Sequence, residues 1–144
     1  MVDPDIVARR LLALSEALRE LDRPAAADAR ALGSDPVLRA AVERWLQVAV
    51  EACIDVAYHL ASDEGWPPPE SGRAAFTTLA AHGRIDHELA QRLGRAAAMR
   101  NVLVHDYVSV DLTRLAAAVR DDLGDLRTFA SIAATWIGDS DANG

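Results

Sequence analysis

The sequence predicts an all-α protein, an antiparallel bundle of four main helices with one or two short additional helices. Three observations support this fold class. Hydrophobic residues make up 51% of the 144 residues and aromatic residues only 5%, which favours closely packed helices over a sheet. Apolar positions recur at helical spacing through most of the chain. Capping residues, prolines and glycines divide this pattern into separate helices.

The first helix is predicted to begin at Asp3 and Pro4, an N-cap residue followed by a proline that suits the first helical position. Its apolar residues are spaced by three or four positions, as in a helix that packs against a neighbour; they are Val7, Leu11, Leu14, Leu18 and Leu21. Pro24 should end this helix. A second, short helical piece is expected over residues 25–32, with Gly33 as its stop.

The longest helix is predicted to run from Asp35, which together with Pro36 repeats the start signal, to about Ser62. Its apolar residues cover more than one face. Residues 65–69, Gly-Trp-Pro-Pro-Pro, should follow as a stiff connector with Trp66 packed down onto the protein.

Polar residues form a narrow stripe along this long helix, at every fourth position: Glu43, Gln47, Glu51, Asp55 and His59. Such a stripe drifts by about 40° per step. A solvated strip is the simpler interpretation, and we favour it for Asp55 and His59. The alternative is that Glu43, Gln47 and Glu51 hold an arginine of a functional site or line a subunit interface.

Three further helices complete the predicted bundle. Ser71 can cap a short helix through His82, and Gly83 can end it. The next helix should run over about 87–104. Asp111 can cap the final helix.

The chain length indicates one domain. We expect residues 1–138 to form a single helical domain and residues 139–144 a flexible C-terminal tail. No apolar run approaches the roughly 20 residues that span a bilayer, and the N-terminus lacks the pattern of a signal peptide. The sequence therefore predicts a cytoplasmic protein that does not enter a membrane.

The basic residues and the single cysteine exclude several classes of protein. All fifteen basic residues are arginine, which rules out a P-loop lysine and a Schiff-base mechanism. Cys53 is the only cysteine, so neither an internal disulfide nor a multi-cysteine zinc site can form. His82, Asp86, His87 and Glu88 lack the usual spacing of metal ligands. We expect no metal and no cofactor.

The net charge of −7 argues against a general nucleic-acid binder, which usually carries a basic surface. The charge is unevenly spread, however. Residues 71–107 hold five arginines against three acidic residues, a balance of +2 that leaves −9 for the remainder. A local positive site on an acidic body suits one phosphate or a short RNA.

Residues 100–107, Arg-Asn-Val-Leu-Val-His-Asp-Tyr, gather the residue types needed for phosphodiester chemistry. The Arg100 guanidinium offers a rigid fork of donors to a phosphate, and His105 can exchange a proton near neutral pH. On one regular helix, Arg100 and His105 would lie roughly 140° apart, so the helix must end or kink near Val104 to bring them together. A surface pair of Arg100 with Asp106 is the simpler alternative.

This motif resembles the signature of the HEPN superfamily and, more narrowly, of the HepT-like toxins of toxin–antitoxin pairs. The pattern is arginine, four residues, histidine, one residue and tyrosine, with an asparagine directly after the arginine. Residues 43–52 of the long helix, Glu-Arg-x-Leu-Gln-x-x-x-Glu-Ala, also resemble that family. The similarity in helix order extends over roughly residues 3–137 and implies the HEPN fold.

The resemblance implies a metal-independent endoribonuclease in which the ribose 2′-hydroxyl attacks the adjacent phosphate. Arg100 and His105 would be catalytic, Asn101 would orient His105 or bind the phosphate, and Tyr107 would contact the RNA or the imidazole. Because each chain supplies one such histidine, it further implies a homodimer with a composite site. The implied partner in a type II or related toxin–antitoxin pair is an MntA-like nucleotidyltransferase antitoxin, which transfers AMP to Tyr107.

Two alternatives remain open from the sequence. One is a catalytically silent HEPN subunit that presents RNA or a nucleotide to a partner nucleotidyltransferase. The other is a helical interaction module in which the motif is a coincidental surface ion pair. The first predicts partner binding without RNA cleavage, and the second predicts no functional effect of replacing Arg100 or His105.

Overall fold

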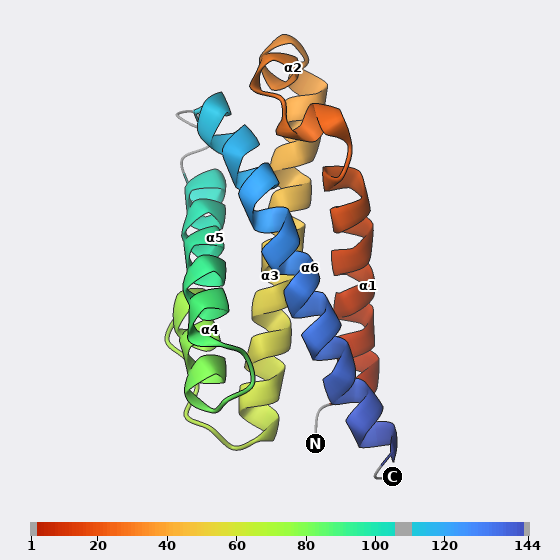
Figure 1. The fold of residues 1–144 in the computed structure, drawn as a ribbon, viewed down its shortest axis with the longest axis vertical. Helices are drawn as coiled ribbons and strands as arrows, with labels where there is room; N and C mark the ends of the chain where they lie inside the picture. Colours follow the sequence, from red (N-terminus) through yellow and green to blue (C-terminus); the bar gives the residue numbers. More distant parts are fainter. Residues whose placement is uncertain (1–2, 106–110, 143–144) are drawn as a thin grey trace.

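The computed structural model describes residues 3–105 and 111–142, and the side chains of residues 3–102 and 111–137. All regular structure in these residues is helical, and the long helices lie side by side as a bundle (Figure 1). The all-α prediction is therefore confirmed. The elements are α1 (Pro4–Leu21), the 3₁₀ helix η1 (Pro24–Ala27), α2 (Ala29–Ser34), α3 (Pro36–Asp63), α4 (Gly72–Ala81), α5 (His87–His105) and α6 (Leu112–Ala142).

The predicted helix starts are confirmed by side-chain caps. Asp3 Oδ1 accepts a hydrogen bond from the backbone N–H of Asp5 at 3.0 Å, and Asp35 Oδ1 accepts from Val37 at 3.1 Å. Equivalent caps begin the later helices, at Ser71, Asp86 and Asp111. Each cap satisfies an N–H that has no partner within its own helix.

The segment after the first helix differs from the prediction. Instead of one helical piece over 25–32, the chain forms η1 and then α2, because Asp28 interrupts the helix and caps a new one. Gly33 does not stop α2, which ends at Ser34 and leads directly into Asp35. Positive φ angles are found among the described glycines only at Gly65 and Gly83, so Gly33 does not form a left-handed helix end.

The final helix is longer than expected. With 31 residues, α6 exceeds the 28 residues of α3, which the sequence predicts to be the longest helix. Its end at Ala142 lies within the 139–144 segment. In the described part of the chain, no helix is both long and apolar enough to cross a membrane.

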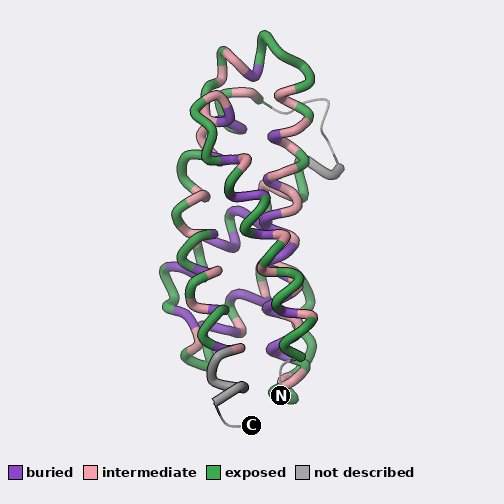
Figure 2. The backbone as a smooth tube through the Cα atoms, turned by 90° about the vertical axis from the view of Figure 1, so that its right-hand side faces the viewer, coloured by how far each residue is buried: buried purple, intermediate pink, exposed green. Residues whose placement is uncertain are grey.

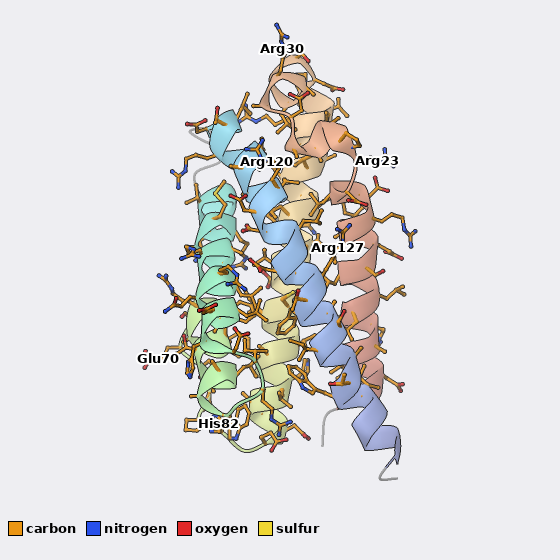
Figure 3. The ribbon with its side chains drawn as sticks, in the orientation of Figure 1. Arg23, Arg30, Glu70, His82, Arg120 and Arg127 are labelled. Carbon is orange, nitrogen blue, oxygen red and sulfur yellow. The ribbon has the colours of Figure 1, made fainter. Side chains whose placement is uncertain are left out.

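The core runs along the interior of the bundle, where the buried positions of the long helices face one another (Figure 2). Helix α3 contributes eleven buried residues and contacts every other described helix. One of the eleven is Cys53, and burial raises the pKa of its thiol. Charged side chains project outward, as Arg23, Arg30 and Arg127 do in Figure 3. None of the described polar or charged residues is fully buried.

An aromatic cluster joins α4 to α6. The rings of Phe76 and Phe129 meet edge to face at a centroid distance of 5.8 Å, and those of Phe129 and Trp136 at 6.0 Å. Phe129 is fully buried. Edge-to-face contacts of this kind add to the free energy gained by burying the rings.

Replacing Phe129 by alanine should therefore destabilise the fold by about 3–5 kcal/mol, because both ring contacts and a large buried side chain are lost. Urea unfolding followed by circular dichroism would measure the change. Ser131→Ala, at an exposed position of the same helix, should stay within about 0.5 kcal/mol of the wild type. Equal loss in both variants would contradict this account of the core.

Candidate functional site

Arg100 lies in the last turns of α5 and is held by two neighbouring side chains. Its guanidinium pairs with Glu51 of α3, and its Nη1 donates a hydrogen bond to Asn101 Oδ1 at 2.8 Å. The Arg100 side chain is 27% exposed. The arginine is thus fixed against the neighbouring helix while part of its donor fork remains open to a ligand.

Among the polar stripe residues proposed to hold the arginine, Glu51 alone has an observed contact with Arg100 in the described part of the chain. Glu43 instead accepts a hydrogen bond from Arg39 Nε at 3.0 Å within α3. Glu43 precedes Glu51 by about 12 Å along the helix axis, which explains why it meets a different partner. Gln47 lies between them and lines a pocket beside Arg100.

That pocket has a volume of about 410 Å³ and is formed by three helices. Helix α1 contributes Arg10, α3 contributes Arg44 among others, and α5 contributes Arg100. Arg10 Nε lies 3.4 Å from Asp55 Oδ2. Three arginines and two carboxylates, Glu51 and Asp55, therefore face one concave surface.

Sequence reasoning did not identify Arg10 or Arg44 as site residues. Arg44 stands within the family-like stretch of the long helix, which is the only signal that points to it. No sequence motif points to Arg10. It enters the site because α1 packs along α3 in a particular register, and that register is not encoded in any short stretch of sequence.

Asp55 is only partly exposed, so it is less solvated than the strip favoured from the sequence would be. Its side chain is only 29% exposed. Burial raises the pKa of the Asp55 carboxyl above its ordinary value, and Arg10 opposes that effect while Glu51 reinforces it. His59, one turn further along α3, is also half-buried. Both residues line a pocket.

The histidine and tyrosine of the motif lie at the boundary of the described structure. His105 is the last residue of α5, one residue beyond the predicted helix end. Its side chain, and all of Asp106 and Tyr107, lie outside the described residues.

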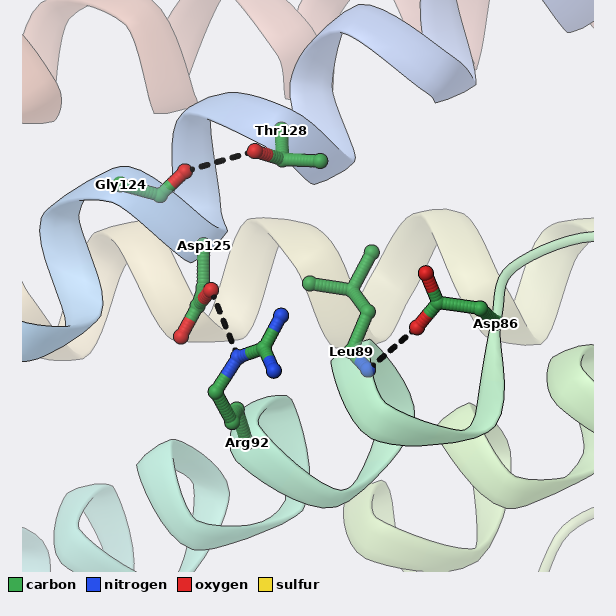
Figure 4. Close-up of polar contacts among 6 residues, drawn as sticks. All are labelled: Asp86, Leu89, Arg92, Gly124, Asp125 and Thr128. Atoms are coloured by element: carbon green, nitrogen blue, oxygen red, sulfur yellow. Dashed lines mark hydrogen bonds and ion pairs between the residues drawn. The ribbon is translucent and has the colours of Figure 1, made fainter.

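A separate pocket, of about 480 Å³, lies between α5 and α6. In Figure 4, Arg92 Nε pairs with Asp125 Oδ1 across this pocket, at 3.0 Å. The other charged residues that line it are Arg95, Arg114, Asp121 and Asp122. Arginines and aspartates are equal in number, so this pocket lacks the positive excess that would favour a phosphate. Among the described residues, no three His, Cys, Asp or Glu side chains are grouped as metal ligands would be.

The fold and the arginine motif place this chain in the class of all-helical HEPN proteins, as the resemblance implies. Within that class, the chain belongs to the family described as "Ribonuclease HepT-like", whose sequence model matches residues 5–132.

Comparison with known proteins shows what this chain is similar to. It is 28% identical over 128 residues to mRNA nuclease HepT of Shewanella oneidensis, a match that covers 89% of this chain and 96% of the relative. A solved structure of the tri-AMPylated Shewanella oneidensis HEPN toxin in complex with MNT antitoxin superposes with a TM-score of 0.83 at 27% identity. The superposition covers 94% of this chain and 99% of the matched chain in that structure. YutE of Bacillus subtilis, a cytosolic protein of unknown function, shares the fold with a TM-score of 0.84 at 16% identity, over 96% of this chain and 93% of YutE.

The pocket between α5 and α6 gives a pH-dependent prediction. Burial, and the neighbouring carboxylates of Asp125 and Asp121, raise the pKa of Asp122 from 3.8 to about 6, against the opposing effect of Arg95. At a pH between these two pKa values, Asp122 keeps its proton in the folded protein but loses it in the unfolded chain. The free energy of unfolding therefore falls as the pH rises towards 6. Asp122→Asn should therefore be more stable than the wild type at pH 7.5, by about 1–2 kcal/mol after allowance for solvent screening.

Urea unfolding at two pH values would measure this effect. At pH 3.5 the carboxyl is mostly protonated in both states, so the difference between wild type and variant should largely disappear. A variant that is no more stable than the wild type at pH 7.5 would show that Asp122 is not destabilised by its surroundings.

Proposed function

We propose that this protein is the toxin of a type II or related toxin–antitoxin pair, and that it is a metal-independent, cytoplasmic endoribonuclease. The observation that carries the proposal is the fixed position of Arg100, held by Glu51 at a pocket that two further arginines line. Similarity to known proteins also supports the proposal: the chain resembles a protein named as an mRNA nuclease and a HEPN toxin whose structure was solved with an MNT antitoxin.

In the proposed reaction, Arg100 binds the scissile phosphate and stabilises the negative charge that grows on it in the transition state. His105 acts as general base or acid. The ribose 2′-oxygen loses its proton and forms a bond to phosphorus, while the bond to the 5′-oxygen of the next nucleotide breaks and that oxygen takes up a proton. The products are a 2′,3′-cyclic phosphate and a free 5′-hydroxyl.

The proposed active species is a homodimer. The reaction needs a base for the 2′-hydroxyl and an acid for the leaving oxygen, and each chain supplies one histidine in the motif. A two-fold interface brings each surface patch against its own copy. Two Arg100–His105 pairs can then share one cleft, in which one histidine accepts a proton and the other donates one.

The charge distribution limits the form of the substrate. The whole chain carries a charge of −7, so a long duplex would meet repulsion over most of the surface. The pocket beside Arg100, by contrast, holds three arginines against two carboxylates. A short single-stranded segment fits this arrangement better than a duplex does.

Arg100→Ala and His105→Ala should each reduce RNA cleavage at least about 100-fold, because one removes charge stabilisation and the other removes proton transfer. The assay would incubate purified protein with total RNA in the presence of EDTA, and induced expression would test growth arrest. Arg127→Ala is a matched control, since Arg127 pairs with Asp22 away from the pocket.

The decisive outcome concerns the wild type. If the folded wild-type protein neither cleaves RNA nor arrests growth, the catalytic proposal fails. The binding-subunit alternative then replaces it, and the engagement of Arg100 by Glu51 would be a resting ion pair rather than a poised catalytic group.

We further propose that an MntA-like nucleotidyltransferase, encoded beside this protein, neutralises it by transferring AMP to Tyr107. An added phosphate two residues from His105 would repel RNA from the cleft. Tyr107→Phe should therefore gain no AMP group on co-expression with that antitoxin, and mass spectrometry would show it. The wild type should gain AMP and lose its ribonuclease activity. Modification of the Phe variant would place the acceptor elsewhere.

A further inference from the structure

A second pocket continues from the candidate site along α3. It has a volume of about 510 Å³ and shares Arg10 and Asp55 with the pocket beside Arg100. Its remaining walls come from the C-terminal end of α3 and from the loop that follows: Tyr58, His59, Ser62, Gly65, Trp66, Pro68 and Pro69. We call this the aromatic pocket. The two pockets are neighbours because Arg10 and Asp55 line both, and we refer to them together as the groove.

The loop wall of the aromatic pocket is held in place by several contacts. The Trp66 backbone N–H donates to the Ala61 carbonyl at 2.9 Å, and the indole stacks on His82 with ring centroids 3.8 Å apart. The Arg84 guanidinium lies 5.9 Å from the Trp66 ring centroid. Three consecutive prolines then restrict the backbone. A pocket with fixed walls loses little conformational entropy when a ligand enters.

The chemistry of the pocket walls matches a flat, polar-edged group. Tyr58, Trp66 and the prolines supply an aromatic and apolar surface, whereas Asp55, His59 and Ser62 supply hydrogen-bonding groups. An unpaired nucleobase has both properties, an aromatic face and an edge of donors and acceptors. A purely apolar ligand would offer no hydrogen bond to these polar groups, whereas a nucleobase can.

The position of the pocket also fits RNA. Glu51, which holds Arg100, and His59 of the aromatic pocket are separated by roughly 12 Å along α3. Arg10 lies between them and lines both pockets, with its side chain 51% exposed. A short single strand can therefore place one phosphate at Arg100, a neighbouring phosphate at Arg10 and a base beyond it.

We propose that the aromatic pocket is a subsite for an unpaired base of the RNA substrate, and that Arg10 holds the phosphate linking that base to the cleavage site. This inference rests on the proposed ribonuclease function and adds a specificity element to it. A base enclosed in a pocket cannot remain paired in a duplex, so the subsite selects single-stranded RNA.

The test measures binding of fluorescein-labelled single-stranded RNA hexamers by fluorescence anisotropy, in the His105→Ala background so that the RNA stays intact. In a hexamer series, each base in turn is replaced by an abasic ribose. One abasic position should weaken binding about tenfold, since the stacking of that base is lost. Ser62→Trp fills the pocket from an exposed helix position. This variant should bind the intact hexamer more weakly, to a similar extent, and should no longer distinguish the intact hexamer from the abasic one.

Ser131→Trp serves as the matched control, because Ser131 is an exposed serine on α6. This variant should bind the intact hexamer as its parent does and should still bind the abasic hexamer more weakly. The inference is overturned if no abasic position matters and Ser62→Trp binds as tightly as its parent, even where the wild type cleaves RNA. It is also overturned if Ser62→Trp changes the molar mass by light scattering, since the pocket would then be a subunit interface. A wild type that neither binds nor cleaves RNA would refute the proposed function, and this inference with it.

Discussion

The burial of α3 is the constraint on which the rest of the structure depends. This helix contacts every other described helix, and its eleven buried residues cover most of its circumference. Only a narrow polar stripe remains, and it too lies close to neighbouring helices. Polar groups at such positions need partners, because a charged group without one is costly to withdraw from water. Glu51 meets Arg100 of α5, and Asp55 meets Arg10 of α1.

These ion pairs contribute more to geometry than to stability. Their side chains are partly exposed, and exposed pairs typically contribute at most about 1 kcal/mol. What they do is fix the direction of two long, flexible arginine side chains that come from different helices. The guanidinium groups of Arg10 and Arg100 are thereby held along one groove. The groove exists only in the folded bundle, since α1, α3 and α5 each supply a necessary part.

The elements that the sequence predicted correctly are those set by local chemistry. The caps at Asp3, Asp35 and Ser71 depend on hydrogen bonds within three residues, which a short stretch of sequence specifies. The break between η1 and α2 is also local, but the alanine-rich segment around Asp28 favours a helix on both sides of it, so the sequence predicts one helical piece there. Helix ends are in general the least certain part of such predictions.

The candidate site was only partly predictable, for a different reason. The four-residue spacing of the α3 stripe predicts that Glu51 contacts Arg100, as observed, but the same spacing equally favours Glu43, which pairs with Arg39. Choosing between them requires the register of α5 against α3. Arg10 likewise depends on how α1 packs along α3. Registers of this kind follow from the packing of the whole core, which no short motif contains.

The pairing of the arginines sets a condition on the proposed binding of a phosphate. A ligand phosphate must compete with Glu51 and Asp55 for the guanidinium groups, so weak or misplaced anions gain little. Burial raises the pKa of Asp55 above its ordinary value, which means that the ionised carboxylate is destabilised where it stands. A phosphate that draws Arg10 away from Asp55 leaves a partly buried carboxylate without the arginine that stabilises it, so the exchange costs free energy. In the proposed function, selectivity for RNA depends on groups that only a nucleotide can satisfy together: a phosphate at the arginines and a base in the aromatic pocket.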